Sequence, residues 1–238
     1  MAGTNSKPDV SLVVCTRNRC EQLVPCLETI QHIEFERPWE LIVVNNGSDD
    51  ATALIVQEFT KAASFTVHHV TEPKLGLGHA RNAGVAAASG EILTFTDDDC
   101  YPAPDFLSRV WAAFRDPSLG YVTGRILLHD PSDLALAIQD YNVPVTFPGK
   151  SFIHPGGVQG ANMPFDVMFF IKLVVLTRYS ARDLYFPPKI WTPRTERVPP
   201  AGKVSIVPIS LSITITGVSR RMLHVCGSPM GLASAPVT

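Results

Sequence analysis

Four short apolar runs, each followed by polar residues, limit the possible folds of this chain more than any other feature. The runs are Val10–Cys15, Leu41–Val44, Phe65–Val70 and Ile92–Thr96. Their length and β-branched content are typical of strands buried in a parallel sheet. Segments with helical patterns lie at 20–33, 51–62, 76–88 and 104–114, and a further strand is expected at 121–128. Strands that alternate with helices predict an α/β fold with a doubly wound, mostly parallel sheet.

The polar residues that follow three of these runs are expected to meet in one crevice. They are the turn Thr16–Arg19, the segment Asn45–Asp50 and the carboxylates Asp97–Asp99. Ligands of such sheets bind beyond the carboxyl ends of the strands, where these segments are expected to lie. Ser48 or an adjacent Asp is a suitable N-cap for the helix at 51–62.

Asp97, Asp98 and Asp99 carry the strongest chemical signal. Three carboxylates at one strand end repel each other unless a cation or hydrogen-bond donors neutralise them. Oxygen ligands suit Mg²⁺ or Mn²⁺, which usually link a protein to substrate phosphates. A solvated acidic turn or a helix N-cap is the alternative. The preceding strand and the following turn, Tyr101–Pro104, favour the metal site.

A strand, an Asp-x-Asp cluster and a Pro-containing turn, in that order, resemble the metal- and nucleotide-binding signature of GT-A glycosyltransferases. Other segments resemble further motifs of the inverting family 2, in the family's order. They are Val13–Arg19, Val43–Ser48, the Gly76-x-Gly78-x-Ala80-Arg81-Asn82-x-Gly84 segment and Gly160–Met163. The resemblance covers residues 8–165 and implies a Rossmann-like GT-A domain, with an incomplete or disordered C-terminal part.

The resemblance also implies a role for each matching residue. Residues that hold the nucleotide base and ribose would be Thr16, Arg17, Asn18, Asn45, Asn46, Gly47 and Ser48. Arg81 and Asn82 would face the base or the diphosphate, because a guanidinium suits phosphate oxygens. Asp97 and Asp98 would bind ribose or the metal's water shell, and Asp97 and Asp99 would bind the metal. The donor-sugar and acceptor pocket would include Gly160, Ala161 and Asn162. The family usually has Asp where this chain has Asn45, which leaves the choice of base open.

The reaction implied is a single displacement, in which a sugar passes from a UDP- or GDP-type donor to an acceptor hydroxyl. The acceptor, a glycan, lipid or protein, is not indicated. A metal stabilises the leaving nucleoside diphosphate, and a carboxylate deprotonates the acceptor. In the family that base is the Asp of a Glu-Asp pair in the second half of the domain.

Other functions fit these residues less well. A sugar-phosphate nucleotidyltransferase would need a Gly-rich loop after the first strand, and Thr16–Arg19 has no glycine. The Gly76-x-Gly78 segment could be a dinucleotide-binding loop only if it followed the first strand, and it does not. A nucleotide-binding module without turnover remains an alternative, because residues 166–238 lack the family's Glu-Asp pair and its Gly-Gly-Phe-Asp motif.

Residues 166–238 differ from the rest of the chain in charge. Residues 1–165 hold 11 Lys and Arg against 19 Asp and Glu, whereas residues 166–238 hold 9 against 3. A shifted reading frame explains this tail. In this shifted frame, the third base of each codon is read together with the first two bases of the next codon. Read in this way, the codons of residues 165–177 permit Arg-Arg-Asp-Val-Leu-His-Lys-Ile-Gly-Gly-Phe-Asp. Met168 followed by Phe169 forces the Val.

The same shift continues downstream. The codons of residues 187–193 permit Pro-Glu-Asp-Leu-Asp-Thr, whose second Asp is forced by Trp191 and Thr192. Those of 201–217 permit Trp-Lys-Gly-Val-Tyr-Arg-Pro-Asp-Ile-Val-Val-Tyr-His-His-His-Gly. We therefore expect residues 166–238 to be out-of-frame translation, poorly ordered and without the general base; a divergent acceptor region is the alternative. Ser205–Thr216 has strand-like composition but no obvious place in the fold.

Composition excludes several classes of protein. The formal net charge of −2 and the absence of a basic run argue against a nucleic-acid partner. No signal peptide or apolar stretch of membrane-spanning length is present, which predicts a cytoplasmic protein, with peripheral binding at the inner membrane face left open.

The five cysteines are expected to be reduced, with Cys100 a packed thiol. His68, His69 and His79 are expected in strands or at the surface rather than as ligands.

Overall fold

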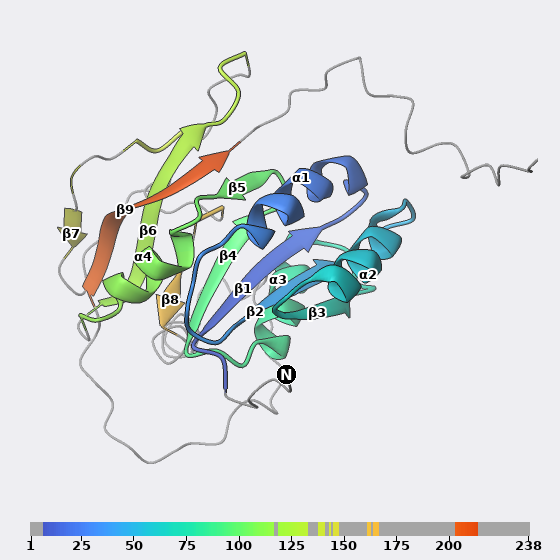
Figure 1. The fold of residues 1–238 in the computed structure, drawn as a ribbon, viewed down its shortest axis with the longest axis horizontal. Coiled ribbons are helices and arrows are strands. Elements are labelled where there is room, and N and C mark those ends of the chain that lie inside the picture. Colours follow the sequence, from blue (N-terminus) through green and yellow to red (C-terminus); the bar gives the residue numbers. More distant parts are fainter. Residues whose placement is uncertain are drawn as a thin grey trace, which may run out of the picture.

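The computed structural model describes most of the chain up to residue 132 and shorter segments beyond it. The described residues are 7–116, 119–132, 138–140, 143, 145–147, 161–162, 164–166 and 203–213. They form one sheet with helices on both faces (Figure 1).

Four parallel strands make up one half of the sheet. They are β1 (Val10–Thr16), β2 (Trp39–Asn45), β3 (Thr66–Thr71) and β4 (Ile92–Asp97). Their order in the sheet is β3-β2-β1-β4, so β4 lies on the opposite side of β1 from β2. In this register Thr16 is level with Asn45 and Cys15 with Asp97, which puts the three polar segments at one edge. The predicted strands and their parallel pairing are confirmed.

The other half of the sheet is mixed. It contains β5 (Cys100–Pro102), β6 (Leu119–Leu128), β7 (Val145–Phe147), β8 (Phe165–Asp166) and β9 (Lys203–Ile213). β8 is antiparallel to β4 and β6, while β9 is parallel to β6 and antiparallel to β5 and β7. The segment 205–213, which had no obvious place from sequence, thus lies in a strand beside β6 (Figure 1).

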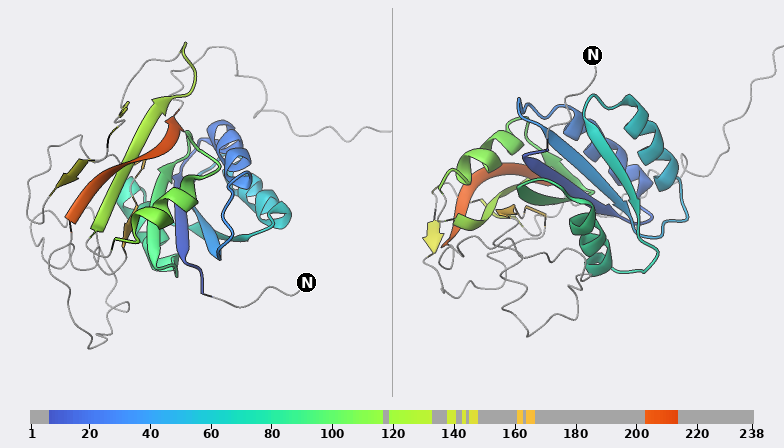
Figure 2. Two further views of the ribbon diagram at one scale, coloured as in Figure 1. Left: turned by 60° about the vertical axis from the view of Figure 1, so that its left-hand side comes forward. Right: turned by 90° about the horizontal axis from the view of Figure 1, so that it is seen from below.

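Helices cover both faces of the sheet, as a doubly wound fold requires. They are α1 (Cys20–Gln31), α2 (Thr52–Ala62), α3 (Leu77–Ala87) and α4 (Phe106–Ala113). Helices α1, α2 and α4 lie on one face and α3 lies on the other (Figure 2). None of the helices in the described part of the chain has both the length and the apolar character needed to cross a membrane.

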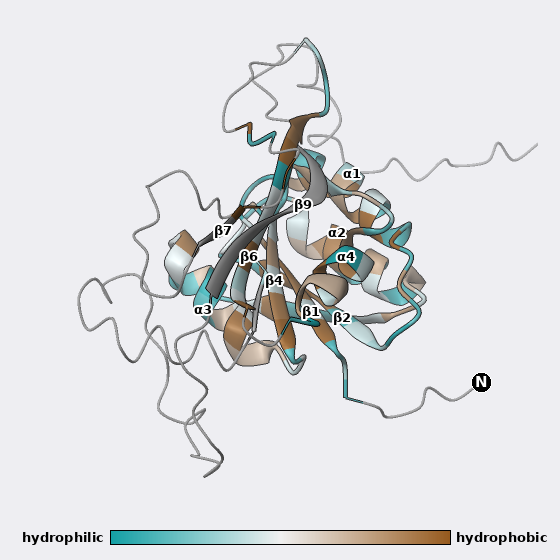
Figure 3. Ribbon diagram, turned by 90° about the vertical axis from the view of Figure 1, so that its left-hand side faces the viewer, coloured by the Kyte–Doolittle hydropathy of each residue, from teal (hydrophilic) through white to brown (hydrophobic). Residues whose placement is uncertain are grey.

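The central strand β1 has a hydrophobic core on each side, because successive side chains of a strand point to opposite faces. Leu12 and Val14 pack with residues of α1, such as Leu23 and Leu27. Val13, between them, packs with Phe95 and the small residues of α3 on the other face. Strands with hydrophobic side chains therefore run through the middle of the domain between helices (Figure 3).

Helix α3 lies close against β1, and a glycine makes this approach possible. A Cβ atom at Gly84 would lie 2.5 Å from Cγ1 of Val13 and 3.4 Å from Cγ2 of Val44. The Ala-rich composition of α3 serves the same close packing, with Ala80 buried against the sheet.

The carboxylate of Asp50 accepts hydrogen bonds at the starts of two helices. One oxygen of its carboxylate accepts the backbone N–H of Cys20 at the start of α1, at 3.1 Å. The other accepts the N–H of Thr52 in α2, at 2.9 Å. These bonds lower the pKa of Asp50, although burial acts in the opposite direction and is the largest single influence. The N-cap position of α2 is Ala51, so the prediction that Ser48 or an adjacent Asp would be the N-cap is wrong; Asp50, one residue before the cap, instead accepts backbone bonds at the starts of both helices.

A buried carboxylate ties β1, β2 and the end of α3 together, at the opposite end of β2 from Asn45. The side chain of Glu40 is only 4% exposed. Its Oε1 accepts hydrogen bonds from Ser11 Oγ at 2.6 Å and from the N–H and hydroxyl of Ser89 at 2.7 and 2.9 Å. His68 Nε2 lies 3.0 Å from Oε2. Burial raises the pKa of Glu40, but these partners together bring it below its ordinary value.

Candidate functional site

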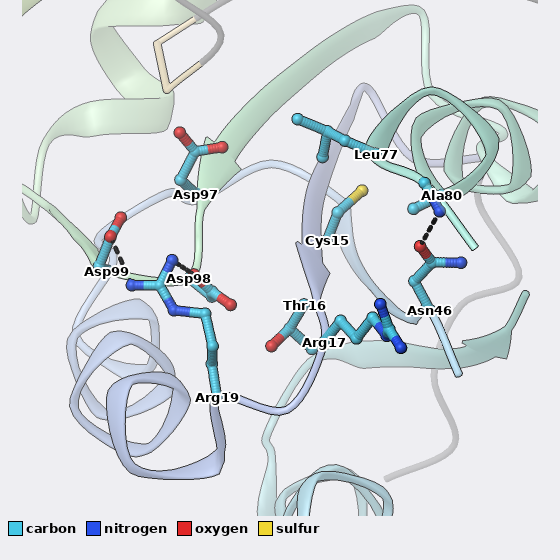
Figure 4. Close-up of a pocket in the computed structure, with 11 residues that line it drawn as sticks. Cys15, Thr16, Arg17, Arg19, Asn46, Leu77, Ala80, Asp97, Asp98 and Asp99 are labelled. Carbon is cyan, nitrogen blue, oxygen red and sulfur yellow. Dashed lines mark hydrogen bonds and ion pairs between the residues drawn. The ribbon is translucent and has the colours of Figure 1, made fainter. Parts of the chain in front are cut away.

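The polar segments that follow β1, β2 and β4 line one pocket of about 380 Å³, together with the start of α3 (Figure 4). The lining residues are Cys15, Thr16, Arg17, Arg19, Asn46, Gly76, Leu77, Ala80, Asp97, Asp98 and Asp99. The strand order reverses between β1 and β4, with α1 and α3 on opposite faces there. Such a switch point opens a crevice at the carboxyl ends of the strands. The predicted single crevice is confirmed.

The three carboxylates of this pocket differ in exposure. The side chains of Asp97, Asp98 and Asp99 are 41%, 5% and 17% exposed. Burial raises the pKa of Asp98 to about 6, although Thr16 and Arg19 act against it, and burial also raises the pKa of Asp97. An added positive charge in the pocket would favour ionisation of both groups.

Each of these carboxylates has an arginine partner. Arg19 Nη1 lies 3.1 Å from Asp98 Oδ1, and Arg19 Nη2 lies 2.7 Å from Asp99 Oδ2. Arg81 Nη2 lies 3.7 Å from Asp97 Oδ1, and the same guanidinium lies over the ring of Phe95. Arg19 was not among the predicted site residues. Three neighbouring carboxylates need counter-ions, so the basic residues of the turn after β1 could have indicated this role for Arg19.

Asp97, Asp99 and Cys100 each place one ligand atom within 4.8 Å of the others. Among the described residues they form the one group of three or more His, Cys, Asp or Glu side chains with this geometry. No histidine takes part in this group. His68 and His69 lie in β3, as expected, whereas His79 lies in helix α3 and is partly buried. Cys100 is fully buried, so the predicted packed thiol is confirmed, and burial raises the pKa of that thiol.

Asn18 and Ser48 join the loop after β1 to the loop after β2. The backbone N–H of Asn18 donates to Ser48 Oγ at 3.0 Å, and Asn18 Oδ1 accepts the N–H of Asp49 at 2.9 Å. Asn18 has a φ of 53°, a left-handed conformation that Asn adopts more readily than most residues. Of the predicted residues in the first loop, Thr16 and Arg17 line the pocket, whereas Asn18 shapes it from outside.

The side chains of Asn45 and Asn46 are engaged in building the loops around the pocket. Asn45 Oδ1 accepts the N–H of Ser48 at 2.9 Å within its own turn. Asn46 Nδ2 donates to the carbonyl oxygens of Glu72 and Lys74 at 2.9 and 2.8 Å. Asn46 Oδ1 accepts the N–H of Gly76 at 2.8 Å. Of these two residues, Asn46 lines the pocket.

The remaining predicted residues lie around the pocket rather than in its lining. Gly47 has a φ of 68°, and Leu75 packs where its Cβ would be. Asn82 is buried on α3, and its Oδ1 has no hydrogen-bond partner among the described residues. Ala161 packs in a buried cluster with Cys100, directly after the carboxylates.

Asn162 is fully buried beside Ala161. Its carbonyl oxygen accepts the hydroxyl of Thr123 at 3.1 Å, and its Nδ2 donates to the carbonyl oxygen of Arg125 at 3.4 Å. Gly160 and Met163 lie outside the described residues, as do Cys226 and most of the tail 167–238. The cysteines that the structure describes, Cys15, Cys20, Cys26 and Cys100, are free thiols, as predicted.

Comparison with known families decides what this pocket belongs to. The family model described as glycosyl transferase family 2 matches residues 11–162, more than half of the 238-residue chain. The chain belongs to glycosyl transferase family 2. The match begins in β1 and ends at Asn162, so it contains every described residue that lines the pocket.

Relatives of this family 2 domain are named as glycosyltransferases of archaea and bacteria. Glycosyltransferase AglE of Haloferax volcanii is 30% identical over 124 residues, which cover 52% of this chain and 41% of AglE. A poly-beta-1,6-N-acetyl-D-glucosamine synthase of Staphylococcus epidermidis is 30% identical over 138 residues, covering 55% of this chain and 31% of the synthase. The chain thus spans less than half the length of these relatives.

Solved structures share the GT-A fold that the sequence predicted for this family 2 domain. The structure of S. aureus TarS 1-349 in complex with UDP-GlcNAc superposes with a TM-score of 0.59 at 17% identity, covering 89% of this chain and 60% of TarS 1-349. The mannosyltransferase PcManGT from Pyrobaculum calidifontis, in complex with GDP-Man and Mn²⁺, superposes with a TM-score of 0.53 at 19% identity. The superposition covers 87% of this chain and 58% of the PcManGT chain.

Proposed function

We propose that this chain carries the donor-binding part of a metal-dependent glycosyltransferase that moves a sugar from a nucleoside-diphosphate sugar to an acceptor hydroxyl. The observation that carries the proposal is the pocket in which Asp97, Asp98 and Asp99 meet the loops after β1 and β2. Family membership supports the reaction type, and two structural neighbours are described with UDP-GlcNAc and with GDP-Man.

The side chains at the acidic end of the pocket fit a divalent cation. Asp97 and Asp99 offer hard carboxylate oxygens close to each other, which suit Mg²⁺ or Mn²⁺. Cys100 is a poor third ligand, because a soft sulfur atom suits Mg²⁺ or Mn²⁺ less well than oxygen does. Asp97 and Asp99 would therefore hold the ion, and PcManGT is described with Mn²⁺. When bound, the ion supplies positive charge for the leaving diphosphate.

The nucleotide would lie along the loops at the ends of β1 and β2. Thr16, Arg17 and Asn46 line this side of the pocket, and Asn18 and Ser48 hold the two loops together. Arg81, which pairs with Asp97 beside the pocket, would contact a phosphate through its guanidinium. Asn45 uses its side-chain oxygen to close its own turn, so base selection falls to other atoms of these loops. A uridine or guanosine donor is proposed.

The acceptor hydroxyl has to be deprotonated by a carboxylate. Of the described residues that line the pocket, Asp97, Asp98 and Asp99 are the only acids, and all three belong to the proposed metal and donor site. Residues 166–238 also lack the Glu-Asp pair of the family, so we infer that this chain lacks the general base and is impaired in transfer. The same observation favours a second function, nucleotide-sugar binding without turnover. Ala161 and Asn162, with Gly160, would shape the acceptor side.

A shift of the reading frame near codon 165 accounts for the missing base. The family match ends at residue 162, just before the proposed shift. We propose that residues 166–238 are out-of-frame translation. Sequencing the gene tests this: an alternative frame there should encode Gly-Gly-Phe-Asp and, downstream, Glu-Asp. A gene in which no frame encodes both motifs would leave a divergent acceptor region instead.

Peripheral binding at the inner face of the membrane and a glycan, lipid or protein acceptor remain part of the proposal. Calorimetry of UDP and GDP, each with and without Mn²⁺, tests the donor site. We expect binding of one nucleotide that depends on Mn²⁺, without transfer of sugar from UDP-GlcNAc or GDP-Man to water or simple glycoside acceptors. Failure of both nucleotides to bind in the presence of Mn²⁺ would contradict the proposed function.

A further inference from the structure

We propose that Arg19 is the internal counter-ion of the donor site: it neutralises Asp98 and Asp99 in the free protein, yields Asp99 to the divalent cation, and then pairs with the donor diphosphate. The inference deepens the proposed function and rests on it. It is carried by the position of one guanidinium between two carboxylates, inside the pocket that the donor would fill.

Arg19 and a metal ion would compete for the same carboxylate. Arg19 Nη2 lies 2.7 Å from Asp99 Oδ2, and Asp99 Oδ1 faces Cys100 Sγ at 3.7 Å. Both oxygens of Asp99 therefore have neighbours in the free protein. Asp99 also belongs to the close group of possible ligands formed with Asp97 and Cys100. A cation that binds Asp99 therefore has to weaken or displace the contact with Arg19.

Asp98 is placed to retain Arg19 when Asp99 changes partner. Its side chain is 5% exposed, and its Oδ1 lies 3.1 Å from Arg19 Nη1. Asp98 is not in the group of possible metal ligands, so metal binding at Asp97 and Asp99 does not require it. The guanidinium can thus stay beside the metal through Asp98 while its second nitrogen becomes available to an incoming anion.

The backbone of Arg19 is fixed, whereas its side chain has room to turn. The carbonyl oxygen of Arg19 accepts the N–H of Leu23 at the first turn of α1, at 3.0 Å. The side chain is 39% exposed, and its guanidinium points toward Asp98 and Asp99 (Figure 4). A guanidinium also presents several N–H groups in one plane, which suits a change from carboxylate to phosphate oxygens.

Arg17 offers a matched comparison on the same loop. It also lines the pocket, but its side chain extends away from the three carboxylates, toward Asn46 (Figure 4). Substitution of Arg17 removes the same charge from the same loop and leaves the contacts of Arg19 in place. The two arginines thus separate a direct contact from a general charge effect.

The experiment measures binding of Mn²⁺ alone to the full chain by electron paramagnetic resonance, and then binding of UDP or GDP in saturating Mn²⁺ by calorimetry. For Arg19→Gln we expect roughly two- to fivefold tighter binding of Mn²⁺ alone, since a partly exposed ion pair no longer competes. Nucleotide affinity should fall on the order of tenfold. Arg17→Gln should change Mn²⁺ affinity by less than about twofold, because the lost charge acts on the ion only at long range and is screened by salt.

A second variant, Arg19→Lys, keeps the proposal testable if Arg19→Gln fails to fold. Lysine keeps the charge and should bind Mn²⁺ alone with an affinity between those of the wild type and Arg19→Gln. Opposite changes in Mn²⁺ and nucleotide affinity support the proposal, because a structural defect would weaken both. Unchanged or weaker Mn²⁺ binding by Arg19→Gln, with normal nucleotide binding by the wild type, overturns the role of Arg19 alone. Absence of any Mn²⁺ or nucleotide binding by all proteins overturns the proposed function as well.

Discussion

The side-chain oxygen of Asn46 accepts a hydrogen bond from the backbone N–H of Gly76 at 2.8 Å, and so joins the end of β2 to the start of α3. The amide nitrogen of the same side chain donates to the carbonyl oxygens of Glu72 and Lys74. Asn46 thus fixes the segment that carries Leu77 and Ala80 into the pocket. An amide is required here because the side chain must donate twice and accept once.

Asn46→Asp should therefore destabilise the domain by about 1–3 kcal/mol, because a carboxylate cannot donate and would face two carbonyl oxygens. Nucleotide affinity should fall with it, since the segment before α3 is no longer held. Urea unfolding and calorimetry measure the two effects. Asn18→Asp is the control: the side chain of Asn18 accepts the N–H of Asp49, which Asp also does, so stability should change little. Equal losses in the two variants would contradict the role given to Asn46.

Glu40 predicts a pH dependence of stability. Its folded-state pKa lies below the ordinary value of 4.5, so the unfolded chain binds its proton more tightly. The contribution of Glu40 is therefore present at neutral pH and is lost as the pH falls from about 4.5 through the folded-state pKa. Glu40→Gln should cost about 1–3 kcal/mol at pH 7. The difference between wild type and variant should shrink as the solution is acidified.

The control for Glu40 is Glu58→Gln, which alters a carboxylate that is 61% exposed and paired with Lys61. Its effect should stay within about 0.5 kcal/mol at every pH. Urea unfolding of the three proteins between pH 3 and pH 7 makes the comparison. A Glu40→Gln effect that grows as the pH falls below about 4.5 would show that the sign assigned here is wrong.

Gly84→Ala tests the close contact between α3 and β1. The added methyl would lie 2.5 Å from Cγ1 of Val13, which has no free space because it is packed against the sheet core. Overpacking of this kind costs about 1–3 kcal/mol, which should exceed the gain in helix propensity of about 1 kcal/mol. A lower midpoint of thermal unfolding is expected. A midpoint equal to or above that of the wild type would show that α3 moves away without cost.

The periodic patterns of the sequence predicted the parallel half of the sheet, because each of its elements is specified by local residues. The expected ends of the first and fourth strands differ by one residue from those of β1 and β4. β5, by contrast, has three residues, includes Pro102, and pairs with a strand about one hundred positions later in the sequence. No local pattern indicates such a strand, since its formation depends on a distant partner.

The composition of the pocket was predictable for a similar reason, and the partners of its side chains were not. Parallel strands bring their carboxyl ends together, so Thr16, Asn46 and the three Asp residues could be placed in one site from the sequence. Whether Arg17 or Arg19 pairs with the acids depends on how the chain enters α1. The roles of Asn18 and Asn45 in holding loops likewise depend on bonds to residues that the motif alone does not identify.

The central claim is that Asp99 binds a divalent cation that holds a nucleoside diphosphate in this pocket. Calorimetric titration of Asp99→Asn with UDP and GDP in Mn²⁺ tests it most directly, with Asp105→Asn, an exposed acid of another loop paired with Arg109, as control. We predict a loss of nucleotide affinity of at least about tenfold for Asp99→Asn and no change for the control. Equal affinity of wild type and Asp99→Asn, with and without Mn²⁺, would contradict the account.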